Sequence, residues 1–138
     1  MTNLTLDARK VFAHDLFATE ATGIALDLVE KDTAICSLDI QPVHRNAMGG
    51  VMGGVMFTLA DLAFAAAANS RCLIDQQPIS WVSLGSSIQY LAQPKGSRLI
   101  AEASCVKQGR TTCVYNIIIH DELNNKTSIV TTTGMRTQ

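Results

Sequence analysis

This 138-residue sequence has few charged side chains and few aromatic ones. Charged residues make up 17% of the chain, where soluble domains average about 25%, and aromatic residues make up 5%. The formal net charge of −1 argues against a nucleic-acid-binding protein, which would carry a concentrated basic face. Glycines and Asp61 interrupt the longest apolar run, so we predict no membrane-spanning helix and no membrane partner.

The cysteines exclude the common zinc sites. Cys36, Cys72, Cys105 and Cys113 form no C-x-x-C pair and have no pair of histidines nearby. Cys105 and Cys113 flank a predicted turn at Gln108-Gly109, which leaves open a cross-hairpin pair or two separate thiols. No basic segment followed by an apolar one opens the chain, as a secretory signal would require. We therefore expect reduced thiols, a cytoplasmic protein, no metal and no resident cofactor.

Hydrophobic residues, in contrast, make up 47% of the chain. A single domain over residues 1–138 is large enough to bury a core without disulfides, but it has limited interior. An apolar excess of this kind favours subunit contacts, so we expect a homo-oligomer.

The residue pattern predicts an α+β domain. Helical spacing predicts a short amphipathic helix over 7–17 and a long apolar helix over 53–69, with a loop over 42–52 between the first strands and the long helix. Alternation predicts strands over 23–30, 33–40, 79–91, 98–107, 111–120 and 128–136. Short turns between the later strands, such as Pro94-Lys95-Gly96, indicate antiparallel neighbours. We expect an antiparallel sheet of about six strands wrapped around the long helix.

Asp61 stands out because no other side chain between Asn46 and Ser70 is ionisable. A carboxylate in so apolar a helix is costly to bury unless something uses or neutralises it. Just upstream, Gly53-Gly54 opens the helix with backbone N–H groups and no side chains. Such a helix start can stabilise an oxyanion, while a carboxylate can act as a general base or a nucleophile.

The spacing of these two features predicts a site shared between subunits. If the helix begins at Gly53, then Asp61 lies eight residues further on, roughly 12 Å along the axis. One carbonyl cannot contact both groups of the same chain. A two-fold dimer with antiparallel helices would place Gly53 of one chain against Asp61 of the other, twice over.

Two segments carry a resemblance to a known family. Asn46-x-x-Gly49-x-x-x-Gly53-Gly54 followed by Leu59-Ala60-Asp61, and Val82-Ser83…Ile88-Gln89-Tyr90-Leu91-x-x-Pro94, resemble the hotdog-fold thioesterases of the PaaI-like (phenylacetic acid degradation) family. The resemblance covers nearly the whole chain, and the spacing from the glycine pair to the Asp is its most specific part.

The resemblance implies a hotdog fold, a dimer and often a tetramer, and hydrolysis of small or medium acyl- or aryl-CoA thioesters. It implies that Gly53 polarises the thioester carbonyl, that Asn46 of the same chain places the thioester, and that Asp61 of the partner drives hydrolysis. Ser83 matches a Ser or Thr position near the attacking water, and Gly54 and Met52 fall at the substrate-binding helix start.

Met52 departs from the family pattern, which usually has histidine there, and methionine can neither donate that hydrogen bond nor titrate. This departure keeps open a hotdog module that binds acyl-CoA without hydrolysing it, and a hotdog dehydratase or hydratase is a third hypothesis. Asp61 itself has a structural alternative, a carboxylate satisfied by backbone or by Thr58. His44 is interpreted as solvated. The cations that would hold the coenzyme A phosphates, among Lys95, Arg98, Lys107, Arg110 and Arg136, stay unassigned.

Overall fold

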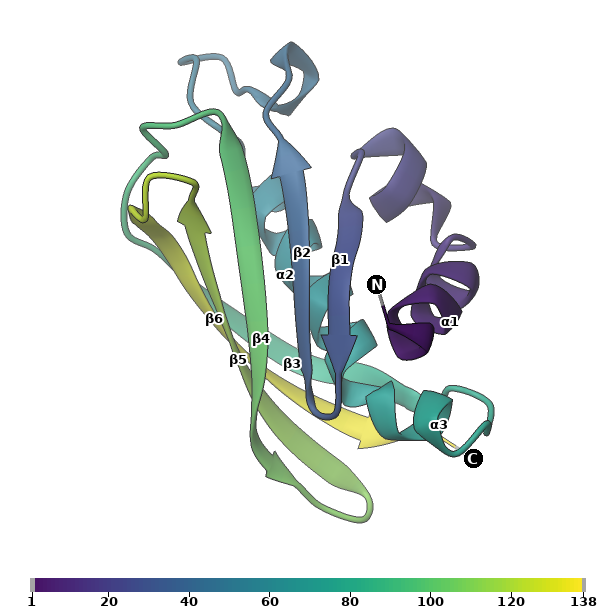
Figure 1. The fold of residues 1–138 in the computed structure, drawn as a ribbon. Helices are drawn as coiled ribbons and strands as arrows, with labels where there is room; N and C mark the ends of the chain where they lie inside the picture. The colour runs from purple at the N-terminus through teal and green to yellow at the C-terminus, as the bar shows by residue number, and fades with distance from the viewer. Residues whose placement is uncertain (1, 138) are drawn as a thin grey trace.

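The computed structural model describes residues 2–137, in which a six-stranded antiparallel sheet curves around helix α2 (Figure 1). The helices are α1 (Asn3–Phe12), α2 (Gly53–Ala68) and α3 (Ser70–Ile74), with a π-helical turn at Phe17–Ala21 and a 3₁₀ turn at Pro42–His44. The strands are β1 (Ala25–Glu30), β2 (Thr33–Asp39), β3 (Trp81–Tyr90), β4 (Arg98–Gln108), β5 (Thr112–Asp121) and β6 (Lys126–Arg136). The predicted α+β arrangement is confirmed. No helix within residues 2–137 is long and apolar enough to cross a membrane.

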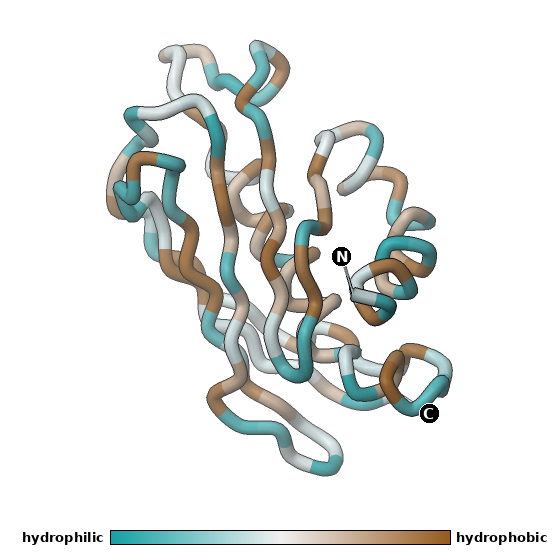
Figure 2. The backbone as a smooth tube through the Cα atoms, in the orientation of Figure 1, coloured by the Kyte–Doolittle hydropathy of each residue, from teal (hydrophilic) through white to brown (hydrophobic). Residues whose placement is uncertain are grey.

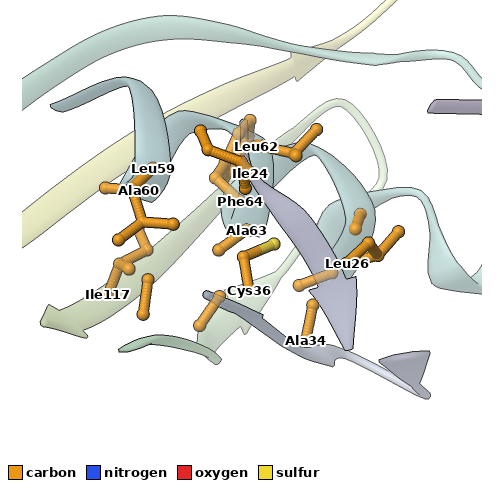
Figure 3. Close-up of a cluster of buried hydrophobic side chains, with 14 of the residues drawn as sticks. Ile24, Leu26, Ala34, Cys36, Leu59, Ala60, Leu62, Ala63, Phe64 and Ile117 are labelled. Atoms are coloured by element: carbon orange, nitrogen blue, oxygen red, sulfur yellow. The ribbon is translucent and has the colours of Figure 1, made fainter. Parts of the chain in front are cut away.

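The core lies between α2 and the concave face of the sheet. Leu59, Ala60 and Ala63 are fully buried on the inner side of the helix, against side chains that include Cys36 and Ile117 of the sheet (Figure 3). Small alanines let the helix approach the sheet closely. Along the chain, hydrophilic residues gather at turns while the strands carry much of the apolar character (Figure 2).

The N-terminal helix differs from its predicted bounds. It begins at Asn3 because the Thr2 side chain accepts the Thr5 N–H at 3.2 Å, a typical N-cap. It ends at Phe12 rather than at residue 17. Leu16 and Phe17 therefore lie beyond the helix, and their side chains are exposed. The short helix α3 was not predicted, because it merely continues the chain after the Asn69 cap of α2.

The strand order is β1-β2-β4-β5-β6-β3, so the predicted adjacency of β3 and β4 is wrong. The connection between them instead runs along the ends of β6 and β5. Thr127 O accepts the Leu91 N–H at 2.9 Å, and Asp121 Oδ2 accepts the N–H groups of Lys95 (2.8 Å) and Gly96 (3.0 Å). These hydrogen bonds satisfy the crossing backbone, which a turn-based prediction could not anticipate.

The cysteines of the β4–β5 hairpin are not opposite each other. Cys105 pairs with Tyr115 in the strand register, and Cys113 pairs with Gln108. All four cysteines of the chain are free. The cross-hairpin alternative is therefore excluded, and the thiols are separate.

Candidate active site

Helix α2 begins at Gly53, as predicted, with backbone donors that the helix cannot satisfy. Met52 occupies the N-cap position without a side-chain cap, and its carbonyl accepts the N–H groups of Val55 (3.1 Å) and Met56 (3.4 Å). The N–H groups of Gly53 and Gly54 have no intrahelical acceptor, because they belong to the first turn. Together with the positive end of the helix dipole, these donors suit a developing oxyanion.

Gly53 lines a hollow of about 430 Å³ together with Asn46, Tyr90 and Gln93, which we call the glycine hollow. The Tyr90 ring lies directly over Gly53, since a Cβ added at that glycine would meet the Tyr90 Cζ and Oη atoms at 2.7 Å. A Cβ at Gly54 would meet nothing within 4 Å. The first glycine thus permits contact with the phenol, and the second leaves the helix start open.

The Asn46 side chain is oriented by the loop that precedes α2. Its Oδ1 atom accepts the N–H groups of Met48 and Gly50, each at 3.0 Å. The Nδ2 group has no hydrogen-bond partner among residues 2–137, and Asn46 is exposed at the glycine hollow. The acceptor half of the amide is therefore structural, while the donor half is free to form a hydrogen bond.

Two further contacts hold this loop against the rest of the fold. Gln93 clamps Val51, with Oε1 accepting its N–H at 2.7 Å and Nε2 donating to its carbonyl at 3.3 Å. The His44 ring is 4% exposed, with Nδ1 accepting the Gln41 N–H at 2.9 Å and Nε2 donating to Thr22 O at 2.7 Å. The interpretation of His44 as solvated is wrong, because both ring nitrogens are used to fix the loop.

Asp61 lies on the side of α2 that faces away from the sheet, one turn from Thr58 and Ala65. The expectation of a buried carboxylate is wrong for the single chain, where Asp61 is exposed. The inner positions of the helix are covered by the sheet and the outer ones are not, which is why the acid is accessible. Thr58 does not satisfy it, since its hydroxyl donates to Gly54 O at 2.8 Å.

Three hollows meet at Asp61, and we call them the acid hollows. The first, of about 340 Å³, includes Asp15 and Phe17; the second, of about 500 Å³, includes Phe17 and Ser83; the third, of about 240 Å³, includes Asp15 and Ser83. The surrounding protein atoms displace water and raise the pKa of Asp61, and the negative charge of Asp15 raises it further. A carboxylate with a raised pKa is a stronger base once it ionises.

The predicted site residues therefore fall into two groups. Asp61 and Ser83 share two of the acid hollows, whereas Gly53 and Asn46 share the glycine hollow. Met52 and Gly54 are exposed beside the helix start and line neither group of hollows. Among residues 2–137, no cluster of three or more His, Cys, Asp or Glu side chains could hold a metal ion.

Sequence reasoning missed four residues at these hollows. Tyr90 stands inside the second segment of the family resemblance, so a signal for it existed. Gln93 falls at an unspecified position of that segment. Asp15 and Phe17 reach Asp61 through the chain after α1, and no sequence pattern indicates that contact.

Comparison with known proteins identifies the family. Residues 48–128 match the model of the thioesterase superfamily. The acyl-coenzyme A thioesterase PaaI of Escherichia coli is 32% identical over 112 residues, which cover 78% of this chain and 76% of that protein. A putative esterase of Archaeoglobus fulgidus is 35% identical over 86 residues, and the match spans 62% of this chain and about half (52%) of the archaeal protein.

Solved structures agree with this result. The Escherichia coli PaaI structure superposes with a TM-score of 0.81 at 26% identity, covering 99% of this chain and 97% of that one. A Streptococcus mutans protein bound to acetyl-CoA gives a TM-score of 0.72 at 27% identity, covering 83% of this chain and 88% of that one. The chain belongs to the thioesterase superfamily: it is a PaaI-like hydrolase with the hotdog fold.

Proposed function

We propose that this protein hydrolyses acyl-CoA thioesters at composite sites, each built from Gly53 and Asn46 of one protomer and Asp61 and Ser83 of its partner. The observation that carries the proposal is the distribution of these four residues over separate hollows of the single chain. Eight helical residues, about 12 Å along the axis, separate the oxyanion donors from the acid. A second copy in antiparallel orientation supplies the missing half to each site.

Strand β3 provides the surface for such a dimer. It pairs with β6 on one side, and within residues 2–137 no strand lies on its other side. Its side chains Val82, Leu84 and Tyr90 are 45%, 62% and 54% exposed, as is Leu91 just beyond at 52%. An unpaired edge with apolar side chains favours pairing with a second β3. A two-fold axis there makes the two α2 helices antiparallel.

In this site the partner's Asp61 takes a proton from water as the water oxygen attacks the thioester carbonyl carbon; direct attack by the carboxylate is the alternative route. The Gly53 N–H and the free Asn46 Nδ2 group donate to the carbonyl oxygen as it gains charge. Ser83 orients the water. Collapse of the intermediate breaks the carbon–sulfur bond, and the proton passes to the thiolate, which gives free coenzyme A and a carboxylic acid.

We assign Gly54 and Met52, at the open start of α2, to substrate binding. Gly54 has no Cβ that would narrow the approach of a substrate to the helix start. The Met52 side chain beside it is 47% exposed. Among the candidate cations, Arg98 lies 3.9 Å from Asp27 and 3.8 Å from Asp39, which favours the other cations as phosphate contacts. The tetramer and the cytoplasmic location stay predictions from the sequence.

The test is release of free thiol from a panel of acyl-CoA substrates by wild type and Asp61→Asn. We expect the variant to lose about 10²–10⁴ in turnover, the range for a positioned base. Asp7→Asn, an exposed carboxylate on α1 away from the hollows, is the matched control and should keep the wild-type rate. An Asp61→Asn protein that folds normally and keeps its rate would contradict the proposed role. Thiol release by wild type also separates hydrolysis from binding alone, and conversion of an added enoyl-CoA to the β-hydroxyacyl-CoA would indicate a hydratase or dehydratase.

A further inference from the structure

Phe17 is an apolar side chain for which the fold provides no cover. It is 70% exposed, and its neighbour Leu16 is 56% exposed, at a π-helical turn that follows α1. Burial of a phenylalanine is strongly favourable, so a ligand that covered these two neighbouring side chains would gain affinity from them. Single π-helical turns are frequent at functional sites.

The position of Phe17 connects it with Asp61. Phe17 lines two of the three acid hollows, and Asp61 lines both of them. Further apolar walls come from α2, through Phe57 in one hollow and Leu62 in the other, and from Leu84 of β3 in the larger hollow. The larger two hollows, of about 340 and 500 Å³, fall in the size range of small-molecule sites, about 300–1,000 Å³.

Charge decides which part of an acyl-CoA enters these hollows. Their lining residues include the carboxylates of Asp15 and Asp61 and no lysine or arginine. Phosphates of coenzyme A would be repelled there. The glycine hollow carries neither sign of charge on its lining residues. A thioester carbonyl beside Asp61 therefore directs its acyl side, and not its coenzyme A side, into the acid hollows.

We propose that the Leu16–Phe17 segment forms the acyl subsite with the outer face of α2, and that Asp15 at its rim rejects acyl groups with a terminal carboxylate. This inference rests on the proposed function for the location of the thioester. It assigns the substrate class as neutral, apolar acyl groups. Phe17 selects by apolar contact, and Asp15 selects by like-charge repulsion.

Binding of coenzyme A thioethers tests this without requiring hydrolysis. S-ethyl, S-butyl and S-hexyl coenzyme A have no thioester to cleave, and calorimetry gives their Kd values on the 138-residue protein. We expect wild type to bind about fourfold more tightly for each added methylene, and Phe17→Ala to lose most of that dependence. Leu123→Ala is the matched control, because Leu123 is 63% exposed in the β5–β6 turn and should leave the dependence intact.

The charge rule is tested with S-carboxypropyl coenzyme A, which differs from the S-butyl compound by a carboxylate in place of the terminal methyl. We expect wild type to bind it at least about tenfold more weakly, and Asp15→Asn to recover most of the difference. A length dependence that Phe17→Ala leaves unchanged, or equal binding of the two compounds by wild type, would overturn the inference. Failure of the proposed function gives a different result. In that case wild type binds these compounds but releases no thiol from acyl-CoA.

Discussion

Complementation between two inactive variants distinguishes composite sites from sites within one chain. Gly53→Pro removes one oxyanion donor with little expected cost to the helix, because proline is well accepted at the first helical position. The preceding Met52 already has φ −63° and ψ 139°, the extended geometry that a following proline requires. Loss of one such donor typically costs about 10²–10³ in turnover. Gly53→Ala adds the same Cβ against Tyr90 but keeps the N–H, so it isolates the donor from the steric effect.

Co-expression of Gly53→Pro with Asp61→Asn then has a defined outcome. Random pairing makes half of the dimers mixed, and each mixed dimer contains one site with both residues intact and one with neither. Activity should rise from about 1% or less in either parent to about one quarter of wild type, measured as thiol release per protomer. If isolated mixed dimers show a thiol-release activity no higher than that of either parent variant, Gly53 and Asp61 act within one chain. The composite site is then refuted.

Three other substitutions give further expected outcomes. Asp15→Asn removes a negative charge that helps to raise the pKa of Asp61, so the ionised base forms at lower pH and the acid limb of kcat/KM should move down in pH; an unmoved limb would exclude this coupling. Asn69→Ala removes the four hydrogen bonds of this buried amide, three with Ser80 and Trp81 at the start of β3 and one with Ala65 O of α2, and urea denaturation should give a loss of about 2–4 kcal/mol in the free energy of unfolding. Burial alone would raise the pKa of Asp121, but hydrogen bonds from Asn125 and neighbouring backbone N–H groups hold it below the ordinary carboxyl value. Its stabilisation is therefore present above the unfolded-state pKa and lost as pH falls through the folded value, so the Tm deficit of Asp121→Asn should be full at pH 7 and shrink in acid.

Local sequence was sufficient for most elements and for the separation of Gly53 from Asp61. The long helix begins at Gly53 and ends at Ala68, one residue from the predicted bound, because glycines open it and Asn69 caps it. Since helical rise is fixed, those bounds also predicted that Gly53 and Asp61 do not share a hollow, and this is confirmed in the single chain.

Long-range contacts account for what the sequence could not predict. The order of the strands depends on Asp121 and Thr127, which hold a crossing connection that reads locally as a simple turn. The buried His44 ring donates a hydrogen bond to the carbonyl of Thr22, 22 residues earlier in the chain. Phe17 comes to lie beside Asp61 through packing of the N-terminal segment on α2. None of these partners leaves a periodic or spacing signal.

In the proposed dimer, the place of β3 at the end of the sheet would delay pairing until β6 has been made. Its register with β6 runs from Trp81 opposite Arg136 to Tyr90 opposite Ser128, so residues about 40 to 55 positions later must arrive before it is fixed. During synthesis, an unfinished polypeptide has the helix and its acid but no ordered edge to offer another molecule. If copies pair through β3 as proposed, pairing is expected only between chains that already contain β6, and premature pairing of nascent chains is disfavoured.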